Sequence, residues 1–326
     1  MTSEQARAYW VVEPGRGAIR DEPLPALASG DALVRTRYSG ISRGTESLVF
    51  LGRVPQAEWT RMRAPFQAGE FPAPVKYGYC NVGEVETGPP DLVGRIVFSL
   101  YPHQTRFVIA TSALHVLPAD VPAGRAVLAA NMETAVNGVW DAGILPGDRV
   151  AVVGAGTVGC LVAWLAGQIR GTEVVLVDVN PARAAAAAAL GVAFAHPDEA
   201  PADNDVVVHV SGTPAGLQRA LRLAAFEAAI VEMSWFGTEQ VTLPLGEAFH
   251  ARRLSIRSSQ VGHVATRQRA RWDYRRRMAF ALSLLHEPAL DALITGESAF
   301  DDLPAIMPAL ARGEVDTICH RIRVLT

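Results

Sequence analysis

The sequence predicts an α/β protein with two domains, a β-rich barrel-like region followed by a doubly wound parallel sheet. The chain has 326 residues, and at roughly 150 residues per domain that length fits two domains. The pattern of residues also changes near Val127, from short runs broken by Gly and Pro to apolar strands alternating with Ala-rich helices. A content of 49% hydrophobic and 19% charged residues is typical of a globular protein.

Residues 1–125 contain short segments with period-two alternation that are separated by turn residues. The clearest are 32–42, 94–102 and 105–111. Alternation interrupted by Gly and Pro is typical of antiparallel strands in a barrel. This part of the chain is therefore expected to be all β.

From about Val127 the chain alternates apolar strands with helical segments. Near-continuous apolar strands joined by crossover helices predict a parallel sheet that is covered on both faces. After Val261 a long helix and a short terminal strand are expected. The expected strands are 149–154, 173–179, 205–212, 228–235 and 319–325, and the expected helices are 157–170, 181–190, 214–224 and 267–285.

Charge and cysteine content exclude several classes of protein. The net charge of −3 argues against a nucleic-acid partner, because phosphate neutralisation needs a basic excess. No apolar run of about 18 residues is present, which argues against a membrane span, and residues 1–30 lack the apolar core of a signal peptide. Three widely spaced cysteines predict neither disulfides nor a Cys-x-x-Cys metal site. A cytoplasmic location is expected.

The strongest local signal is a glycine-rich turn between an apolar strand and an apolar helix. Gly154 permits a tight turn, Gly156 lets the backbone approach a pyrophosphate, and Gly159 allows close packing of helix on strand. Asp178 ends the next strand, 19 residues beyond the last glycine, where it can accept both ribose hydroxyls. The pattern favours a dinucleotide site, and the alternative is an ordinary turn with Asp178 capping the following helix.

The carboxylate of Asp178 favours NAD over NADP because its charge repels a 2′-phosphate. Arg183 is nearby in the sequence, so NADP remains the alternative cofactor. The helix after the turn offers unpaired N–H groups to the phosphates, and Ser211 with Gly212 follows another strand at its carboxyl end. The expected cofactor-binding residues are Gly154, Gly156, Thr157, Val158, Gly159, Asp178, Val179, Arg183, Ser211, Gly212 and Thr134.

These motifs, in this order, resemble the medium-chain dehydrogenase/reductase superfamily. The resemblance implies a GroES-like catalytic domain over 1–124 and 266–326 and a Rossmann dinucleotide-binding domain over 125–265. It also implies a homodimer and a small-molecule alcohol or carbonyl substrate. The matching segments are 39–46, 71–88, 134–159 and 177–191.

The chain departs from the zinc-dependent members of that superfamily at each expected ligand position. Those positions hold Ser42 or Arg43, then Tyr79, then a residue near Ala130, whereas zinc needs thiolate, imidazole or carboxylate ligands. The four-cysteine structural zinc lobe is also absent from the sequence. A zinc-independent member is therefore expected, and residues 40–55 are similar to the branch of 3-hydroxyethyl bacteriochlorophyllide a dehydrogenases.

Without a metal, another group has to stabilise alkoxide charge beside the nicotinamide. Tyr79 stands at a former ligand position, and the resemblance implies that Ser42 and Arg43 line the same site. Phenol and guanidinium donors can stabilise an oxyanion, and a Tyr or Ser can pass the proton. The alternative is that Tyr79 only fills the space that the metal vacates.

Three more residues are candidates for the substrate pocket. Trp235 and Phe236 follow a sheet strand at its carboxyl end, where open α/β sheets bind ligands, and core packing is the equal alternative. Glu133 is expected either to face the nicotinamide or to cap a helix. The basic run Arg267, Arg269, Arg271, Arg275, Arg276 and Arg277 favours a solvated helix face over an anion site.

Together these features predict a zinc-independent, NAD(H)-dependent oxidoreductase acting on an alcohol/carbonyl pair. The second hypothesis is an NAD(P)H-binding sensor or structural protein without turnover, because the sequence contains no decisive acid/base constellation.

Overall fold

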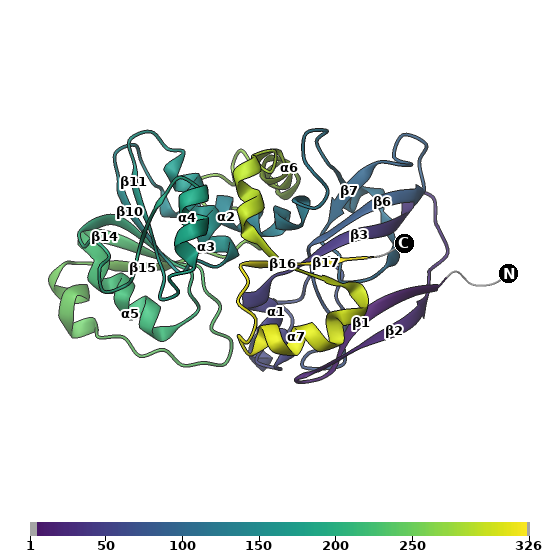
Figure 1. Cartoon of the computed structure of the whole chain (residues 1–326), viewed down its shortest axis with the longest axis horizontal. Helices are drawn as coiled ribbons and strands as arrows, with labels where there is room; N and C mark the ends of the chain where they lie inside the picture. Colours follow the sequence, from purple (N-terminus) through teal and green to yellow (C-terminus); the bar gives the residue numbers. More distant parts are fainter. Residues whose placement is uncertain (1–4, 325–326) are drawn as a thin grey trace. The chain divides into compact units, whose positions relative to one another are not determined.

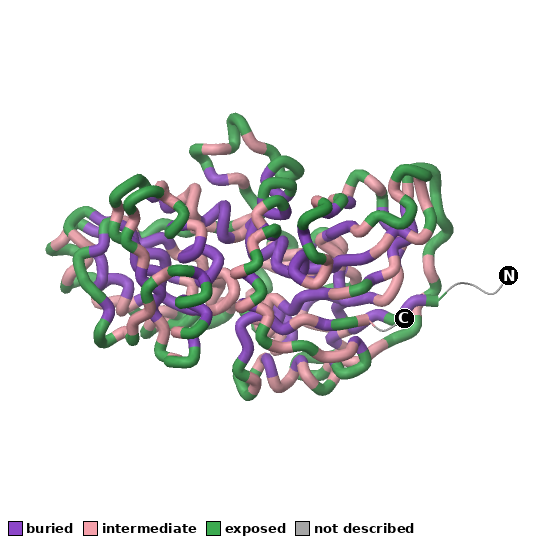
Figure 2. Tube along the Cα trace, turned by 45° about the horizontal axis from the view of Figure 1, so that its top comes forward, coloured by how far each residue is buried: buried purple, intermediate pink, exposed green. Residues whose placement is uncertain are grey.

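A computed structural model describes residues 5–324 (Figure 1). Its contacts divide the chain into two compact units. Among the described residues, unit 1 comprises residues 5–130, 282–287 and 294–324, and unit 2 comprises residues 131–281 and 288–293. Figure 2 shows that each unit has buried segments inside and exposed segments around them. Within residues 5–324, no helix combines the length and the apolar character that a membrane span requires.

Unit 1 is built from two sheets. One has four strands in the order β2-β1-β5-β4, and the other has seven, with β16-β17-β3-β6-β7-β9 in order and β8 paired to β3. Alternating buried and exposed side chains along β1 reflect the predicted period of two. The strands are β1 (Gln5–Glu13), β2 (Arg16–Pro23), β3 (Asp31–Ile41), β4 (Ala68–Gly69), β5 (Val75–Lys76), β6 (Asn81–Thr87), β7 (Ile96–Ser99), β8 (Arg106–Ala110), β9 (His115–Val116), β16 (Ile294–Ala299) and β17 (Cys319–Arg323).

Helices are few and short in unit 1. Helix α1 begins directly after β3, and α7 packs against both α1 and β2. The α-helices are α1 (Arg43–Phe50) and α7 (Leu303–Ala311), and the 3₁₀ helices are η1 (Gln56–Glu58), η2 (Thr111–Ala113), η3 (Ala126–Leu128) and η6 (Phe300–Asp302).

Unit 2 contains a six-stranded sheet in the order β12-β11-β10-β13-β14-β15, and every neighbouring pair in it is parallel. The order reverses between β10 and β13, which makes this the topological switch point. The connection from β10 to β11 runs toward one edge of the sheet and that from β13 to β14 toward the other, so the right-handed rule for such crossovers predicts α3 and α5 on opposite faces. The strands are β10 (Arg149–Val153), β11 (Glu173–Val177), β12 (Ala193–Ala195), β13 (Asn204–His209), β14 (Ala224–Glu232) and β15 (Ser255–Ser258).

The helices of unit 2 follow the predicted alternation. Helix α3 packs on β10 and β11, while α5 packs on β10, β13 and β14, which buries the valine-rich strands between them. The helices are α2 (Ala129–Ala142), α3 (Thr157–Gly167), α4 (Arg183–Ala189), α5 (Pro214–Leu223), η4 (Leu245–Phe249), α6 (Tyr274–Leu284) and η5 (Pro288–Leu293).

Two expectations about the C-terminal third differ from the structure. The helix expected over 267–285 begins only at Tyr274, because the Asp273 carboxylate accepts a hydrogen bond from the backbone N–H of Arg276 at 2.7 Å and caps it there. The return to the first domain was expected at residue 266, whereas residues 266–281 belong to unit 2. Arg277 holds this segment to α2 through Glu133.

Candidate functional site

The glycine-rich turn of unit 2 lies between β10 and α3, and its glycines have distinct roles. Gly154 has φ +114°, and a Cβ there would lie 2.6 Å from the Cα of Ser211. A Cβ on Gly159 would lie 1.8 Å from the Gly154 carbonyl oxygen, whereas one on Gly156 would meet nothing within 4 Å. The turn is therefore packed tightly against β13 and α3, with open space beside Gly156.

Helix α3 begins at Thr157 with Gly156 as its N-cap, and no side chain caps it. The first turn of a helix presents backbone N–H groups and the positive end of the helix dipole to an anion. Thr157 and Val158 lie in this first turn, partly exposed. Geometry, glycines and dipole together fit a pyrophosphate.

Asp178 follows β11 and is tied to the glycine turn. Its Oδ2 accepts a hydrogen bond from the backbone N–H of Ala155 at 2.7 Å, and its Oδ1 accepts one from Asn180 at 2.8 Å. A carboxylate has about four lone-pair sites, so two remain for other donors. The backbone thus fixes a negative charge beside the turn while leaving it able to accept hydroxyl groups.

The other expected cofactor residues have varied surroundings. Val179 is 71% exposed, Thr134 is partly buried in α2, and Arg183 is buried at the start of α4. Arg183 also acts on Cys160, since its charge opposes the burial that raises the pKa of that thiol to about 12. The buried Arg183 side chain therefore lies in the interior of unit 2.

Ser211 and Gly212 belong to a turn that packs on the glycine-rich turn, and two residues that the sequence analysis missed support it. His209 Nε2 lies 2.7 Å from Ser211 Oγ, and His209 Nδ1 lies 2.6 Å from Glu232 Oε2. A signal was available, because His209 and Glu232 each end an apolar strand. We call Ser211, His209 and Glu232 the unit 2 histidine chain.

Unit 1 contains a similar set, which we call the unit 1 histidine chain. His103 Nδ1 lies 2.7 Å from Ser39 Oγ, and His103 Nε2 lies 2.8 Å from Glu46 Oε2. All three residues are buried. The other Glu46 oxygen accepts the backbone N–H of Ser42 at 2.7 Å, so this carboxylate anchors the start of α1.

Tyr79 stands in the segment between β5 and β6. Burial raises the pKa of its phenol, Cys80 and the Glu46 carboxylate raise it further, and hydrogen bonding with the side chains of Ser42 and Thr45 opposes the rise. The structure therefore brings Tyr79 and Ser42 together. A phenol with a raised pKa keeps its proton at neutral pH, so Tyr79 is a hydrogen-bond donor there rather than a base.

Arg43 is the first residue of α1. Its guanidinium donates to the backbone carbonyl of Thr317 at 3.3 Å, which links α1 to the segment before β17. Arg43 follows Ser42 directly in the sequence, but this contact ties its side chain to the C-terminal part of unit 1.

The expected zinc-ligand positions hold side chains that do not fit zinc. Ser42, Arg43 and Tyr79 provide hydroxyl, guanidinium and phenol groups, and Ala130 provides none. Among residues 5–324, no group of three or more His, Cys, Asp or Glu side chains could hold a metal ion.

Glu133 and Arg277 form a buried ion pair within unit 2. Arg277 Nε lies 3.0 Å from Glu133 Oε1, and the same guanidinium donates to Asn137 Oδ1 at 2.6 Å and to the Val261 carbonyl at 2.6 Å. Burial raises the pKa of Glu133, while Arg277 opposes the rise. The expectation of a solvated basic run was thus wrong for Arg277, which is 2% exposed.

Trp235 and Phe236 follow β14, and both are partly buried. The ring of Phe236 stacks on that of His209 with centroids 6.1 Å apart, and Phe236 packs against the core of unit 2. These contacts agree with the core-packing alternative for Phe236, and a place for Trp235 and Phe236 in a substrate pocket stays a prediction.

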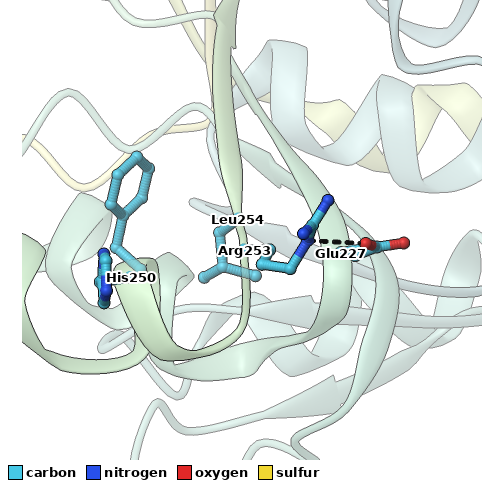
Figure 3. Close-up of a pocket in the computed structure, with 5 residues that line it drawn as sticks. Glu227, His250, Arg253 and Leu254 are labelled. Atoms are coloured by element: carbon cyan, nitrogen blue, oxygen red, sulfur yellow. Dashed lines mark ion pairs between the residues drawn. The ribbon is translucent and has the colours of Figure 1, made fainter.

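A shallow surface pocket lies elsewhere in unit 2 (Figure 3), lined by Glu227, Phe249, His250, Arg253 and Leu254. Arg253 Nε and Glu227 Oε1 form an exposed ion pair at 2.8 Å. This pocket contains none of the residues expected to bind cofactor or substrate.

No protein-family model matches the chain, but solved structures do. The 2R,3R-butanediol dehydrogenase of Bacillus subtilis is 18% identical with a TM-score of 0.77, over 98% of this chain and 99% of that one. A zinc-binding dehydrogenase from Sinorhizobium meliloti 1021 bound to NADP is 17% identical, with a TM-score of 0.78 and the same coverage. An alcohol dehydrogenase from Escherichia coli CFT073 complexed with NADH is 17% identical, with a TM-score of 0.75 and the same coverage.

These similarities confirm the predicted fold class, an α/β protein with a GroES-like β-barrel domain and a Rossmann domain. At such low identity they establish the fold and leave the activity to the residues of this chain.

Proposed function

We propose that this chain is an NAD(H)-dependent oxidoreductase of the medium-chain dehydrogenase/reductase type that interconverts an alcohol and a carbonyl compound without zinc. The observation that carries the proposal is the glycine-rich turn with Asp178 fixed beside it. Structures of similar fold are bound to NADP and NADH. The similarity to the bacteriochlorophyllide dehydrogenase branch stays a prediction.

The residues of unit 2 divide the binding of the dinucleotide among them. The N–H groups at the start of α3 would hold the pyrophosphate, and the free lone pairs of Asp178 would accept the ribose hydroxyls. The charge of Asp178 disfavours a 2′-phosphate, so NADH is the proposed cofactor. When bound, the nicotinamide supplies or accepts a hydride.

Residues of unit 1 would stabilise the negative charge that develops on the substrate oxygen. Tyr79 keeps its proton at neutral pH, because the ordinary pKa of a phenol is about 10 and burial raises it further, so it can donate a hydrogen bond to a carbonyl oxygen as negative charge develops there. Hydrogen bonding with Ser42 orients the phenol. Tyr79 thus acts as donor and Ser42 as its positioning partner, and Arg43 adds a positive charge at the start of α1, next to Ser42 in the sequence.

Calorimetry with NADH and NADPH tests the cofactor. The native chain should bind NADH more tightly, and Asp178→Ala should reduce that preference because the repulsive charge is lost. Asp205→Ala, which removes an exposed carboxylate before Val206 in β13, is the matched control and should leave the preference unchanged. Equal or tighter binding of NADPH by the native chain would contradict the assignment.

Turnover with a panel of carbonyl compounds tests the chemistry. Loss of one oxyanion donor lowers turnover by about 10²–10³ in a hydrolase, and Tyr79→Phe should have an effect of similar order with NADH affinity unchanged. Tight NADH binding without any turnover across the panel would instead favour a sensor. Metal analysis of active protein tests zinc independence, since one tightly held zinc per chain would overturn it.

The proposal includes a homodimer. Strand β15 is the edge of the sheet in unit 2, and all four of its residues are exposed, so its backbone groups are available for pairing. Light scattering should give the molar mass of two chains, and a monomer at micromolar concentration would contradict the dimer.

A further inference from the structure

The unit 2 histidine chain has a fixed direction. The Glu232 carboxylate can only accept, so Nδ1 of His209 carries the proton and donates it at 2.6 Å. Nε2 then accepts the Ser211 hydroxyl proton across 2.7 Å. His209 is fully buried, which strengthens both bonds because water does not compete for them.

The same carboxylate holds the other half of the turn. Glu232 Oε1 accepts the backbone N–H of Ser234 at 2.6 Å, and Ser234 Oγ accepts the backbone N–H of Gly212 at 3.0 Å. Two hydrogen-bonded paths therefore run from Glu232, one to Ser211 and one to Gly212. Together they fix the orientation of a turn that would otherwise be free to move.

The Ser211 side chain has no capacity left for a further ligand. Its hydrogen is donated to His209, while its oxygen faces Thr213 Oγ1 at 3.0 Å and accepts the Thr213 N–H at 3.3 Å. Gly216 of α5 closes the space beside it, because a Cβ there would lie 2.1 Å from Ser211 Oγ. The hydroxyl therefore serves the turn, and the exposed backbone around Gly212 faces solvent.

The turn occupies a defined place on the sheet. It follows β13, beside the switch point between β10 and β13, and it touches the glycine-rich turn through Gly154. Asp178 lies on the other side, after β11. An extended dinucleotide whose ribose meets Asp178 and whose pyrophosphate meets α3 would place its second half over the ends of β13 and β14.

We infer that Glu232 and His209, acting through Ser211, are positioning residues for the nicotinamide half of the dinucleotide. They hold the backbone of residues 210–213 where that half would lie, and they have no role for the adenosine half. This inference rests on the proposed function, since it takes the dinucleotide as the ligand of unit 2.

Parallel titrations with NADH and with ADP-ribose, which lacks the nicotinamide, test the inference. Ser211→Ala removes the end of the chain, and the loss of one ordering hydrogen bond should weaken NADH binding by about tenfold. ADP-ribose affinity should stay within about twofold of native, because its contacts lie at Asp178 and α3. The exposed Ser255→Ala in β15 is the matched control and should change neither affinity.

Glu232→Gln supplies an independent variant of nearly native shape. A glutamine amide can donate to Nδ1 and shift the His209 proton to Nε2, which reverses the bond to Ser211. NADH binding should weaken while ADP-ribose binding is retained.

Equal losses for NADH and ADP-ribose in both variants would mean that the chain only supports the fold, and unchanged NADH affinity would also overturn the inference. If the native chain binds neither ligand, the proposed function itself fails.

Discussion

The two histidine chains use the same three residue types but run in opposite directions around the ring. In unit 1 the carboxylate of Glu46 meets Nε2 of His103, whereas in unit 2 the carboxylate of Glu232 meets Nδ1 of His209. The serine of unit 1 is buried in β3, and that of unit 2 lies in a partly exposed turn. The closed chain of unit 1 orders buried groups, among them the start of α1 beside Tyr79. The open chain of unit 2 ends in a partly exposed turn and can fix the backbone at the surface there.

The buried ion pair of unit 2 gives the largest expected effect. Arg277→Met leaves the Glu133 carboxylate buried without its partner, and breaking such a pair lowers the free energy of unfolding by about 3–5 kcal/mol. If this pair stabilises unit 2 more than the hydrogen bonds of His209 do, urea unfolding should show a larger loss of unfolding free energy for Arg277→Met than for Glu232→Gln.

The pH dependence of the unfolding free energy tests whether the loss in Arg277→Met comes from the unpaired Glu133 carboxylate. Without Arg277, the burial that raises the pKa of Glu133 is unopposed, so folded Glu133 takes up a proton more readily than unfolded Glu133. Stability from that proton is present at low pH and lost as pH rises. The deficit of the variant should therefore shrink from pH 7 to pH 5, and a deficit independent of pH would contradict the account.

His103→Ala should give the second largest loss and is the direct break of the unit 1 chain. It leaves a buried carboxylate with only the Ser42 N–H, and it leaves the buried Ser39 hydroxyl without its acceptor. We expect a loss of about 3 kcal/mol in unfolding free energy. Adding Glu46→Gln should restore part of it, and a loss below about 1 kcal/mol in the single variant would contradict a structural role.

The difference between the two chains also explains what could be predicted from the sequence. His209 and Glu232 each follow three apolar strand residues, and neighbouring parallel strands bring their ends together, so local pattern contained a usable signal. His103 and Glu46 meet through the closure of the barrel across 57 positions. Nothing local to either residue specifies that contact.

The glycine-rich turn was predictable for a related reason. Gly154 and Gly159 each meet a backbone requirement that is set within a few residues or by the adjacent strand, as the close approach of Gly159 to the Gly154 carbonyl shows. The burial of Arg277 depended instead on a partner far along the chain, Glu133, whereas the start of α6 at Tyr274 follows from the local cap by Asp273. Periodicity predicts the elements, but it does not predict which charged side chain is buried in an ion pair with another element.

Alkaline pH should affect the two units similarly, which tests whether their difference is confined to the histidine chains. Burial raises the pKa of Cys160 in unit 2 and of Cys319 in unit 1 to about 12, from an ordinary 9.0. Between these values the unfolded chain holds fewer protons than the folded one, so stability falls as pH rises, by up to about 1.4 kcal/mol per pH unit for each thiol.

The unfolding free energy of the native chain should fall between pH 9 and 11. Cys160→Ala and Cys319→Ala should each make that fall less steep, by the slope that corresponds to about one proton. Urea titrations across that range measure the slope of unfolding free energy against pH. The smaller side chain of alanine lowers stability by the same amount at every pH, so this packing loss does not change the slope. A slope identical to that of the native chain would show that the replaced thiol already ionises in the folded state.

The smallest expected effect comes from removing the serine at the end of each chain. Ser39→Ala deletes a hydroxyl that is 1% exposed and leaves His103 Nδ1 unsatisfied in the interior, which should lower the unfolding free energy by about 1–2 kcal/mol. Ser211→Ala acts at a partly exposed turn where water can reach the vacated position, so we expect a loss of about 0.5 kcal/mol or less. Thermal unfolding of the two variants in the same buffer measures both losses.

Because the substitution and the partner residue types are the same, the ratio of the two losses reports how far each chain is shielded from water. Equal losses would show that the turn in unit 2 is as sealed as the core of unit 1, and that Ser211 has no route by which to order a ligand at the surface.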